Sequence, residues 1–340
     1  MATEVKCLAS LDVGKDPVPS TLTRRDLRRD DVEVKILFCG ICHSDIHHVR
    51  NDWGTEVYPL VPGHEIIGKV SRVGVDVTKF KVGDSVGIGC MVDSCQTCGA
   101  CKHDQEQYCA SNTLTYGKVD HRDGSRTYGG YAETIVVTEK FVLSVPEGLD
   151  LAGAAPLLCA GITTYSPLRR WGVGPGKKVG VVGLGGLGHM ALKLAKAMGA
   201  DVALFSRSQG KAEDAKRLGA DYLLISTDPK QMEAVAGQFD LIIDTVPYNH
   251  DVNPYISTLT PEGSIVLVGY LGPLEPTVNS APPGSLIGGI KETQEMLDFC
   301  GKHRVTSDIE IIRARDLHSA YERVLKADVK YRFVIDIATL

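Results

Sequence analysis

One short run, CQTCGACKHDQEQYC, contains four cysteines: Cys95, Cys98, Cys101 and Cys109. Thiolates spaced this closely make a tetrahedral all-cysteine zinc site, which is closed and therefore structural rather than catalytic. The alternatives are a disulfide cluster or ordinary core cysteines. Disulfides need an oxidising compartment, and the N-terminal residues show no apolar core of signal-peptide length. The run therefore predicts a zinc-bound lobe over residues 90–110 and directs attention to a second metal site.

The composition is that of a soluble globular protein with room for two domains, since 43% of the 340 residues are hydrophobic and 23% are charged. A net charge of −5, without any block of Lys or Arg, gives no electrostatic basis for binding nucleic acid. The longest uncharged stretch, residues 151–168, contains two prolines and two glycines. We therefore interpret it as buried interior and not as a membrane span. Ten cysteines without an export signal predict a reducing, cytoplasmic location.

The pattern of apolar residues changes near the middle of the chain. The first part is punctuated by glycine and has short β-branched runs at 32–38, 66–73 and 134–137. From Lys177 onwards, the strand-like runs KKVGVV, DVALFS, DLIIDTV and GSIVLVG alternate with the helical stretches HMALKLAKAMGA and KAEDAKRLGA. This alternation predicts βαβ crossovers and a parallel sheet. A further helix is predicted at 291–302, and a last strand in YRFVIDI.

The predicted fold class is therefore α/β. A Rossmann doubly wound parallel-sheet domain is expected at 155–288. A β-rich domain is expected at 1–154, and the chain is expected to return to it at 289–340.

Three further residues have ligand character but lie far apart in the sequence: Cys42 in GICHSD, His64 in PGHE, and Cys159 in LLCAG. One histidine and two cysteines with an open fourth position form the ligand set of a catalytic zinc ion. Taken singly, a cysteine in an apolar run such as Cys159 is more often an ordinary buried small side chain. His64, followed by Glu65, could be a hydrogen-bonded turn histidine. Their spacing alone does not decide between these interpretations.

Several polar residues follow Cys42 directly. A zinc-bound histidine needs an acceptor for its second ring nitrogen, and Asp45 is a candidate for this role. Ser44 could carry a proton to or from a substrate oxygen, and His47 could pass it to solvent. His43 is either a surface residue or a phosphate contact.

A glycine-rich turn follows the strand predicted at 178–182 and opens the helix that begins at His189. In this strand–turn–helix context, backbone amides and the helix N-terminus can approach a pyrophosphate. The residues of this turn are Gly183, Gly185, Gly186, Leu187 and Gly188.

The end of the next strand indicates which dinucleotide binds. An NAD-preferring site needs an acid there for the ribose hydroxyls. This chain has Ser206, Arg207 and Ser208, with Lys211 shortly after, while Asp201 precedes the strand. Two hydroxyls and two cations can bind a 2′-phosphate, which an acid would repel. The alternative is a chance pair of surface cations, but the pattern favours NADP over NAD.

Taken together, these motifs resemble the zinc-dependent medium-chain alcohol dehydrogenases, and specifically their cinnamyl-alcohol-dehydrogenase-like, NADP-dependent branch. The resemblance extends over nearly the whole chain. Its blocks are GICHSDIH, VPGHE, GCMVDSCQTCGAC, EQYC, GGYAE, APLLCAGITTYSPLRRW, GLGGLGH, GSLIGGIKETQEMLDFC and VKYRFVID. It implies that the β-rich part is a GroES-like catalytic domain that carries the structural zinc lobe.

The resemblance also implies roles for individual residues. The catalytic zinc would bind Cys42, His64 and Cys159, with Glu65 beside it, and Ser44 and His47 would relay the proton. Thr163 would lie against the nicotinamide, and Arg332 and His43 near the pyrophosphate. Trp53 would form part of the substrate pocket wall, although an ordinary packed loop tryptophan is the alternative.

The function implied is that of an NADP(H)-dependent aldehyde reductase, reversible as a primary-alcohol dehydrogenase, with a structural and a catalytic zinc ion in each chain. Aromatic or medium-chain aldehydes and alcohols are the expected substrates, and the segment SLIGG is expected to form an edge strand through which chains dimerise. Between Val278 and Ser285, however, the chain is shorter than the family pattern. A non-enzymatic zinc- and NADPH-binding protein, or an inactive relative, is therefore the alternative. A zinc-free quinone-reductase-like enzyme and a polyol dehydrogenase fit the motifs less well.

Overall fold

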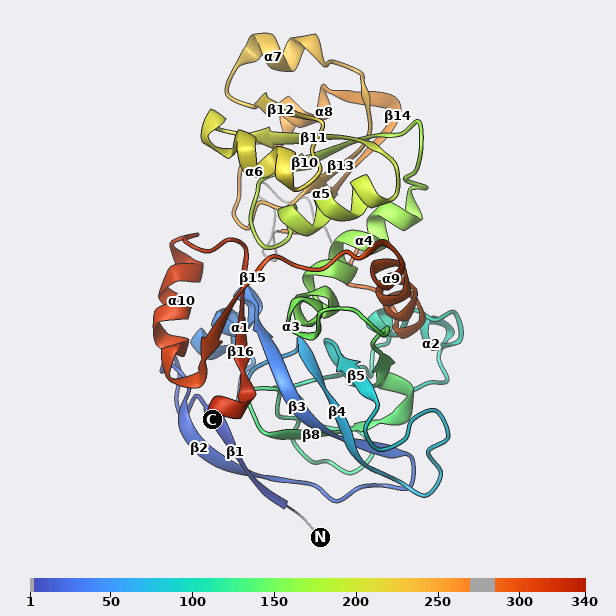
Figure 1. Cartoon of the computed structure of the whole chain (residues 1–340), viewed down its shortest axis with the longest axis vertical. Helices are drawn as coiled ribbons and strands as arrows, with labels where there is room; N and C mark the ends of the chain where they lie inside the picture. The colour runs from blue at the N-terminus through green and yellow to red at the C-terminus, as the bar shows by residue number, and fades with distance from the viewer. Residues whose placement is uncertain (1–2, 270–284) are drawn as a thin grey trace. The chain divides into compact units, whose positions relative to one another are not determined.

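The structure is a computed structural model that describes residues 3–269 and 285–340 (Figure 1). Its internal contacts divide the chain into two compact units. The first comprises Met1–Cys159 with Gly289–Leu340, and the second comprises Ala160–Gly288. The sequence analysis placed the first boundary after residue 154, whereas the structural division falls between Cys159 and Ala160. Cys159 therefore belongs to the first unit.

The first unit is built on a mixed sheet. Within the described residues, its strands follow the order β15-β16-β3-β4-β5-β9, and β8 pairs with the start of β3. The bounds are β3 Asp31–Ile41, β4 Ile66–Val73, β5 Ser85–Ile88, β8 Thr134–Thr138, β9 Leu143–Ser144, β15 Ile309–Arg313 and β16 Arg332–Asp336. The C-terminal strand β16 lies directly beside the N-terminal β3 (Figure 1). The runs predicted at 32–38, 66–73 and 134–137 are confirmed as β3, β4 and β8.

Short hairpins and helices complete this unit. The hairpins are β1 Thr3–Ala9 with β2 Val18–Arg24, and β6 Met91–Asp93 with β7 Thr113–Leu114. The α-helices are α1 His43–Arg50, α2 Gly99–Lys102, α3 Leu151–Ala154, α9 Ile290–His303 and α10 Leu317–Leu325. The 3-10 turns are η1 Glu106–Tyr108, η2 Glu139–Phe141, η3 Ala155–Leu158, η5 Ala314–Asp316 and η6 Ile337–Thr339. The helix predicted at 291–302 is confirmed as α9, and the strand in YRFVIDI as β16.

The second unit is a parallel sheet in the order β12-β11-β10-β13-β14, which confirms the Rossmann prediction. Its strands are β10 Lys178–Val182, β11 Asp201–Ser206, β12 Tyr222–Ile225, β13 Phe239–Asp244 and β14 Leu259–Leu267. Its helices are α4 Ala160–Arg170, α5 Gly188–Ala197, α6 Ala212–Arg217, α7 Pro229–Ala234 and α8 Asn253–Ile256, with the 3-10 turn η4 Gln209–Lys211. Strands buried on both faces have continuous apolar runs, and Phe205 and Phe239 anchor the core on one face. The sequence analysis missed β12, because this short strand is only partly buried.

Two other expectations concern single segments. No individual helix among the described residues is long and apolar enough to cross a membrane; Leu151–Leu158 and Ala160–Arg170 pass such a test only as a bent pair. The expected edge strand SLIGG is not formed within the chain, since the backbone over 285–289 forms no strand, and dimerisation through this segment stays a prediction. A strand exists only where a neighbouring strand satisfies its backbone groups, and no such neighbour is described here. The shortened segment after Val278 lies outside the described residues, apart from Ser285.

Candidate active site

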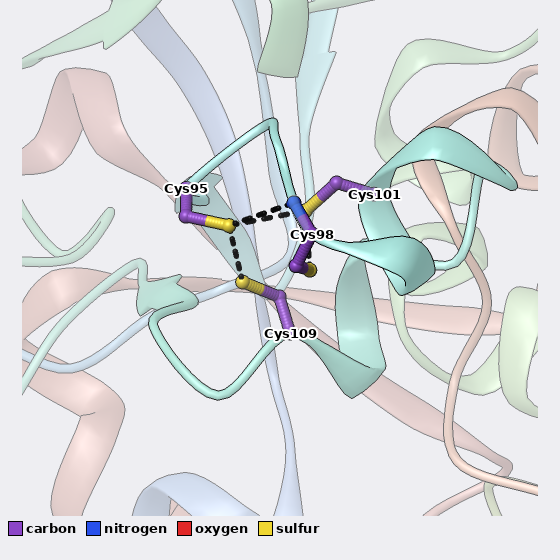
Figure 2. A group of neighbouring side chains, drawn as sticks. All are labelled: Cys95, Cys98, Cys101 and Cys109. Atoms are coloured by element: carbon purple, nitrogen blue, oxygen red, sulfur yellow. Dashed lines mark hydrogen bonds between the residues drawn. The ribbon is translucent and has the colours of Figure 1, made fainter.

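The four cysteines of the lobe converge on one point (Figure 2). Their sulfurs are separated by 3.9 Å for Cys95 and Cys101, 3.5 Å for Cys98 and Cys101, and 3.5 Å for Cys95 and Cys109. A tetrahedral zinc ion with Zn–S bonds of about 2.3 Å holds its sulfurs about 3.8 Å apart. A disulfide would require about 2.0 Å, and all four cysteines are free. The geometry therefore fits zinc and excludes a disulfide pairing in this structure.

The backbone of the lobe favours a thiolate at Cys95. Backbone N–H groups of Thr97 and Cys98 point at its sulfur and lower the pKa of the thiol to about 6; the bond from Cys98 N is 3.4 Å long. Burial instead raises the pKa of Cys101 to about 11, although the Ser94 hydroxyl lies 3.2 Å from its sulfur. Cysteine ligands bind zinc as thiolates, so metal binding at this lobe would release protons.

A second cluster forms where β3, β4 and η3 end or begin. Cys42 caps the N-terminus of α1 directly after β3, while His64 and Glu65 precede β4, and Cys159 follows η3. β3 and β4 are antiparallel neighbours, so the end of one strand meets the start of the other. This pairing joins ligands that are far apart in sequence. One ligand atom from each of these four residues lies within 4.8 Å of the others.

The cluster has the dimensions of a zinc site. The sulfurs of Cys42 and Cys159 are 3.8 Å apart, close to the separation that a tetrahedral zinc imposes. A hydrogen bond from Cys159 holds the pKa of Cys42 well below its usual range, although burial opposes this, and the charge of Arg332 adds to the effect. The surroundings of Cys42 therefore favour its thiolate form.

Asp45 is the centre of the supporting network. It is fully buried at the third position of α1, where its carboxylate accepts the N-cap amide in a capping box. The carboxylate is contacted by Cys42 N at 2.9 Å, Gly63 N at 3.0 Å, Tyr116 Oη at 2.7 Å, Tyr131 Oη at 3.4 Å and His64 Nδ1 at 3.2 Å. With Nδ1 bonded to Asp45, the Nε2 atom of His64 is left for a metal.

Glu65 forms a fully buried ion pair with Arg332 on β16. Burial raises the pKa of Glu65 to about 8, against the opposing charge of Arg332. Within the described residues, Glu65 Oε2 has no hydrogen-bond partner, so this oxygen is available to bind a metal ion. The structure places the Arg332 guanidinium on this carboxylate, and its predicted pyrophosphate contact stays a prediction.

The remaining predicted residues of this unit lie on or just after α1. Ser44 Oγ is 3.6 Å from the sulfur of Cys42. His47 Nδ1 is 2.7 Å from Asp52 Oδ2, and its ring lies 4.9 Å from the ring of His43 and 5.3 Å from that of Trp53. Burial is the main cause that lowers the pKa of His43, with His47 adding to it.

Several residues around this site were missed by the sequence analysis, Asp52 and Tyr116 among them. Asp52 follows His47 by five residues, beyond the helix, and gave only a weak local signal. Tyr116 lies 71 residues from Asp45 and gave none.

The glycine turn of the second unit has the shape of a phosphate cradle. Gly183 has a φ of +87°, and its N–H donates to Phe205 O at 3.1 Å. A Cβ at Gly188 would lie 2.1 Å from Gly183 O, whereas a Cβ at Gly185 would meet nothing within 4 Å. The turn is therefore tightly closed at Gly188 and open at Gly185, where a pyrophosphate needs room. Gly186 and Leu187 lie between them, and α5 begins at Gly188.

Strand β11 brings the candidate 2′-phosphate residues to the same end of the sheet as the glycine turn. Val182 pairs with Phe205, so both turns follow strand ends that lie side by side. Ser206 Oγ accepts from Ser208 N at 3.3 Å and donates to Ser208 O at 3.1 Å, which shapes the turn. Arg207 and Ser208 are exposed, and Lys211 lies in η4. Thr163 is a half-buried residue of α4 in the same unit.

Comparison with known proteins places these sites in a family context. The profile of the alcohol dehydrogenase GroES-like domain matches residues 28–147, and that of the zinc-binding dehydrogenases matches residues 186–304. The chain is 53% identical over 347 aligned residues to an NADP-dependent alcohol dehydrogenase C from Mycolicibacterium smegmatis, covering 99% of both chains.

Solved structures agree with this similarity. A cinnamyl alcohol dehydrogenase from Sorghum bicolor superposes with a TM-score of 0.93 at 47% identity, covering 99% of this chain and 98% of that chain. A cinnamyl alcohol dehydrogenase from Helicobacter pylori, solved with NADP(H), gives a TM-score of 0.90 at 42% identity and covers 99% of both chains.

Proposed function

The chain belongs to the zinc-dependent medium-chain alcohol dehydrogenases, in their cinnamyl-alcohol-dehydrogenase-like branch, and we propose that it interconverts primary alcohols and aldehydes with NADP(H). The observation that carries the proposal is the buried cluster of Cys42, His64 and Cys159, in which Asp45 already holds His64 in the ligating orientation. A structural zinc in the cysteine lobe and a catalytic zinc in this cluster complete the proposed enzyme.

The donor set of the catalytic cluster suits zinc. Two thiolates and one imidazole are the ligands of catalytic zinc sites that keep one position open for substrate. When bound, zinc supplies Lewis acidity that polarises a substrate oxygen, and NADPH supplies the hydride. Asp45 orients His64, and Arg332 balances the charge of Glu65 next to the ligands.

The proton is moved by residues of α1 in this proposal. Ser44 and His47 are three positions apart on the helix and therefore on one face. Ser44 exchanges a proton with the substrate oxygen, and the half-exposed His47 exchanges it with solvent. Asp52, at 2.7 Å from His47 Nδ1, holds the orientation of the imidazole ring.

The choice of NADP(H) rests on the turn after β11. Ser206, Arg207, Ser208 and Lys211 offer hydroxyls and cations and no carboxylate, which suits a 2′-phosphate. The named cofactor of the Mycolicibacterium smegmatis relative and the NADP(H) in the Helicobacter pylori structure support this choice. Thr163 and His43 remain proposed contacts of the nicotinamide and of the pyrophosphate.

The substrate class is proposed from Trp53. The Trp53 ring makes a tilted contact with His47 and an edge-on contact with His48, and 37% of the residue is exposed. A flat apolar substrate can therefore pack on it. Aromatic or medium-chain aldehydes are therefore the proposed substrates. The cytoplasmic location and the homodimer stay predictions. Light scattering on the purified protein tests the oligomeric state.

The test is a cofactor-oxidation assay with cinnamaldehyde and benzaldehyde, run with NADPH and with NADH on protein whose zinc is measured in the same preparation. We expect turnover with NADPH, weak turnover with NADH, and about two zinc ions per chain. Tight NADPH binding without turnover on any aldehyde would instead favour a non-enzymatic zinc- and nucleotide-binding protein.

A further inference from the structure

His48 is enclosed between two aromatic side chains of the first unit. Its ring meets Trp53 edge-on at 4.6 Å with an interplanar angle of 73°, and Tyr116 at 4.9 Å and 77°. Only 16% of its side chain is exposed. Edge-to-face contacts of this kind are attractive and directional. The ring of His48 therefore fixes the relative position of Trp53 and Tyr116.

A buried carboxylate holds the His48 ring in this orientation. Nδ1 of His48 lies 2.7 Å from Oε1 of Glu56, whose side chain is only 2% exposed. The Glu56 backbone is fixed in turn, since its N–H donates to Asn51 Oδ1 at 3.0 Å. The segment that carries Trp53 is thus tied back to α1 through the pair of His48 and Glu56.

Tyr116 connects this arrangement to the metal ligands. Its hydroxyl donates to Asp45 Oδ1 at 2.7 Å, and the same oxygen is 3.2 Å from His64 Nδ1. The Tyr116 ring also lies 5.9 Å from the His64 ring. A continuous set of contacts therefore runs from Trp53 through His48 and Tyr116 to the zinc ligand.

We propose that His48, held by Glu56, is a positioning residue that sets the distance between Trp53 and the zinc-ligand shell and thereby selects bulky aromatic aldehydes. This inference rests on the proposed aldehyde reductase function. His48 itself touches no reacting atom in this scheme. Its effect is on the fit of large substrates, and not on the chemistry at the carbonyl.

The experiment compares His48→Ala, His48→Phe and His48→Gln for a large and a small aldehyde, cinnamaldehyde and acetaldehyde. In His48→Ala we expect KM for cinnamaldehyde to rise about tenfold and KM for acetaldehyde to change less than about twofold. His48→Phe keeps the ring and His48→Gln keeps a hydrogen bond to Glu56, so each should restore part of the selectivity. His318→Ala, on an exposed histidine with its own carboxylate partner, is the matched control.

A second readout needs no turnover. The chain has two tryptophans, so a Trp171→Phe background leaves Trp53 as the sole indole fluorophore. His48→Ala in this background should increase acrylamide quenching of Trp53 about twofold, because the indole loses its edge contact. This measurement tests the positioning role even for a protein that reduces no aldehyde. An equal rise of KM for both aldehydes, or unchanged quenching of Trp53, would overturn the proposal.

Discussion

Replacing Asp45 with Asn should weaken zinc binding at the catalytic cluster in a protein that still folds. Asn has nearly the same volume, so the buried position creates no cavity. It removes the negative charge that faces His64 Nδ1 at 3.2 Å, and one of its two terminal atoms becomes a donor. The amide oxygen can replace one carboxylate oxygen only.

The expected cost follows from the contacts of each oxygen. With the amide oxygen kept toward Gly63 and Tyr116, the new NH₂ group faces the N–H of Cys42, which donated to Oδ2 at 2.9 Å. A buried donor left without an acceptor costs about 1–3 kcal/mol of stability. Loss of the carboxylate behind a zinc-bound histidine typically weakens metal binding about 10–100-fold. We therefore expect the free energy of unfolding of Asp45→Asn to be about 2 kcal/mol lower than that of the wild type. Its affinity for zinc at the catalytic cluster should fall about 10–100-fold.

Chelator competition monitored by a zinc-sensitive dye provides the assay, and urea unfolding measures stability. The cysteine lobe acts as an internal reference, because its zinc should leave Asp45→Asn at the wild-type rate. Asp76→Asn is the external control, since Asp76 is an exposed residue paired with Arg29, and such pairs contribute under about 1 kcal/mol. If Asp45→Asn keeps both zinc ions with wild-type affinity, the assigned role of Asp45 is wrong.

Four further variants test the other parts of the proposed enzyme. Cys159→Ala should abolish turnover and leave NADPH binding within about twofold of wild type, because it removes one of the three proposed zinc ligands of the catalytic cluster. Equal loss of activity and of NADPH binding, the latter measured by fluorescence titration, would count against this assignment. Replacing Ser206 by Asp together with Arg207→Ala should shift the ratio of kcat/KM from NADPH toward NADH by at least about tenfold, as an acid repels the 2′-phosphate; an unchanged ratio would refute the role given to this turn. Gly185→Ala should fold normally and raise KM for NADPH about tenfold, because a methyl group fills the open space where a pyrophosphate would approach. Gly188→Ala should lower the melting temperature, since its Cβ would lie 2.1 Å from a carbonyl oxygen. Equal thermal stability of the two variants would contradict the geometry of the turn.

Local motifs made part of this protein predictable from its sequence. The cysteine lobe and the glycine turn each arise from one short run, so spacing alone indicates how their residues meet. The Rossmann order follows from strands that alternate with helices, because strands buried on both faces have a continuous apolar composition.

Long-range features were less accessible. Cys42, His64 and Cys159 were joined by family resemblance, since only the pairing of β3 with β4 brings the first two together. Nothing local marks Tyr116 or Glu56 as partners of α1, because their contacts depend on how separate loops pack. The segment at 285–289 was expected to be a strand from the same resemblance, and its backbone pairs with no described strand.

The return of the chain to the first sheet constrains the order in which the protein can mature on the ribosome. The Rossmann unit is continuous and ends at Gly288, whereas β3 pairs with β16, which is synthesised after that unit. Until Arg332 emerges, the carboxylate of Glu65 lacks the cation that balances it in the buried interior. We therefore expect the Rossmann unit of a nascent chain to be complete before the carboxylate of Glu65 has its partner. Truncations near the C-terminus should consequently damage the catalytic unit first, although the sequence they remove is remote from Cys42 and His64.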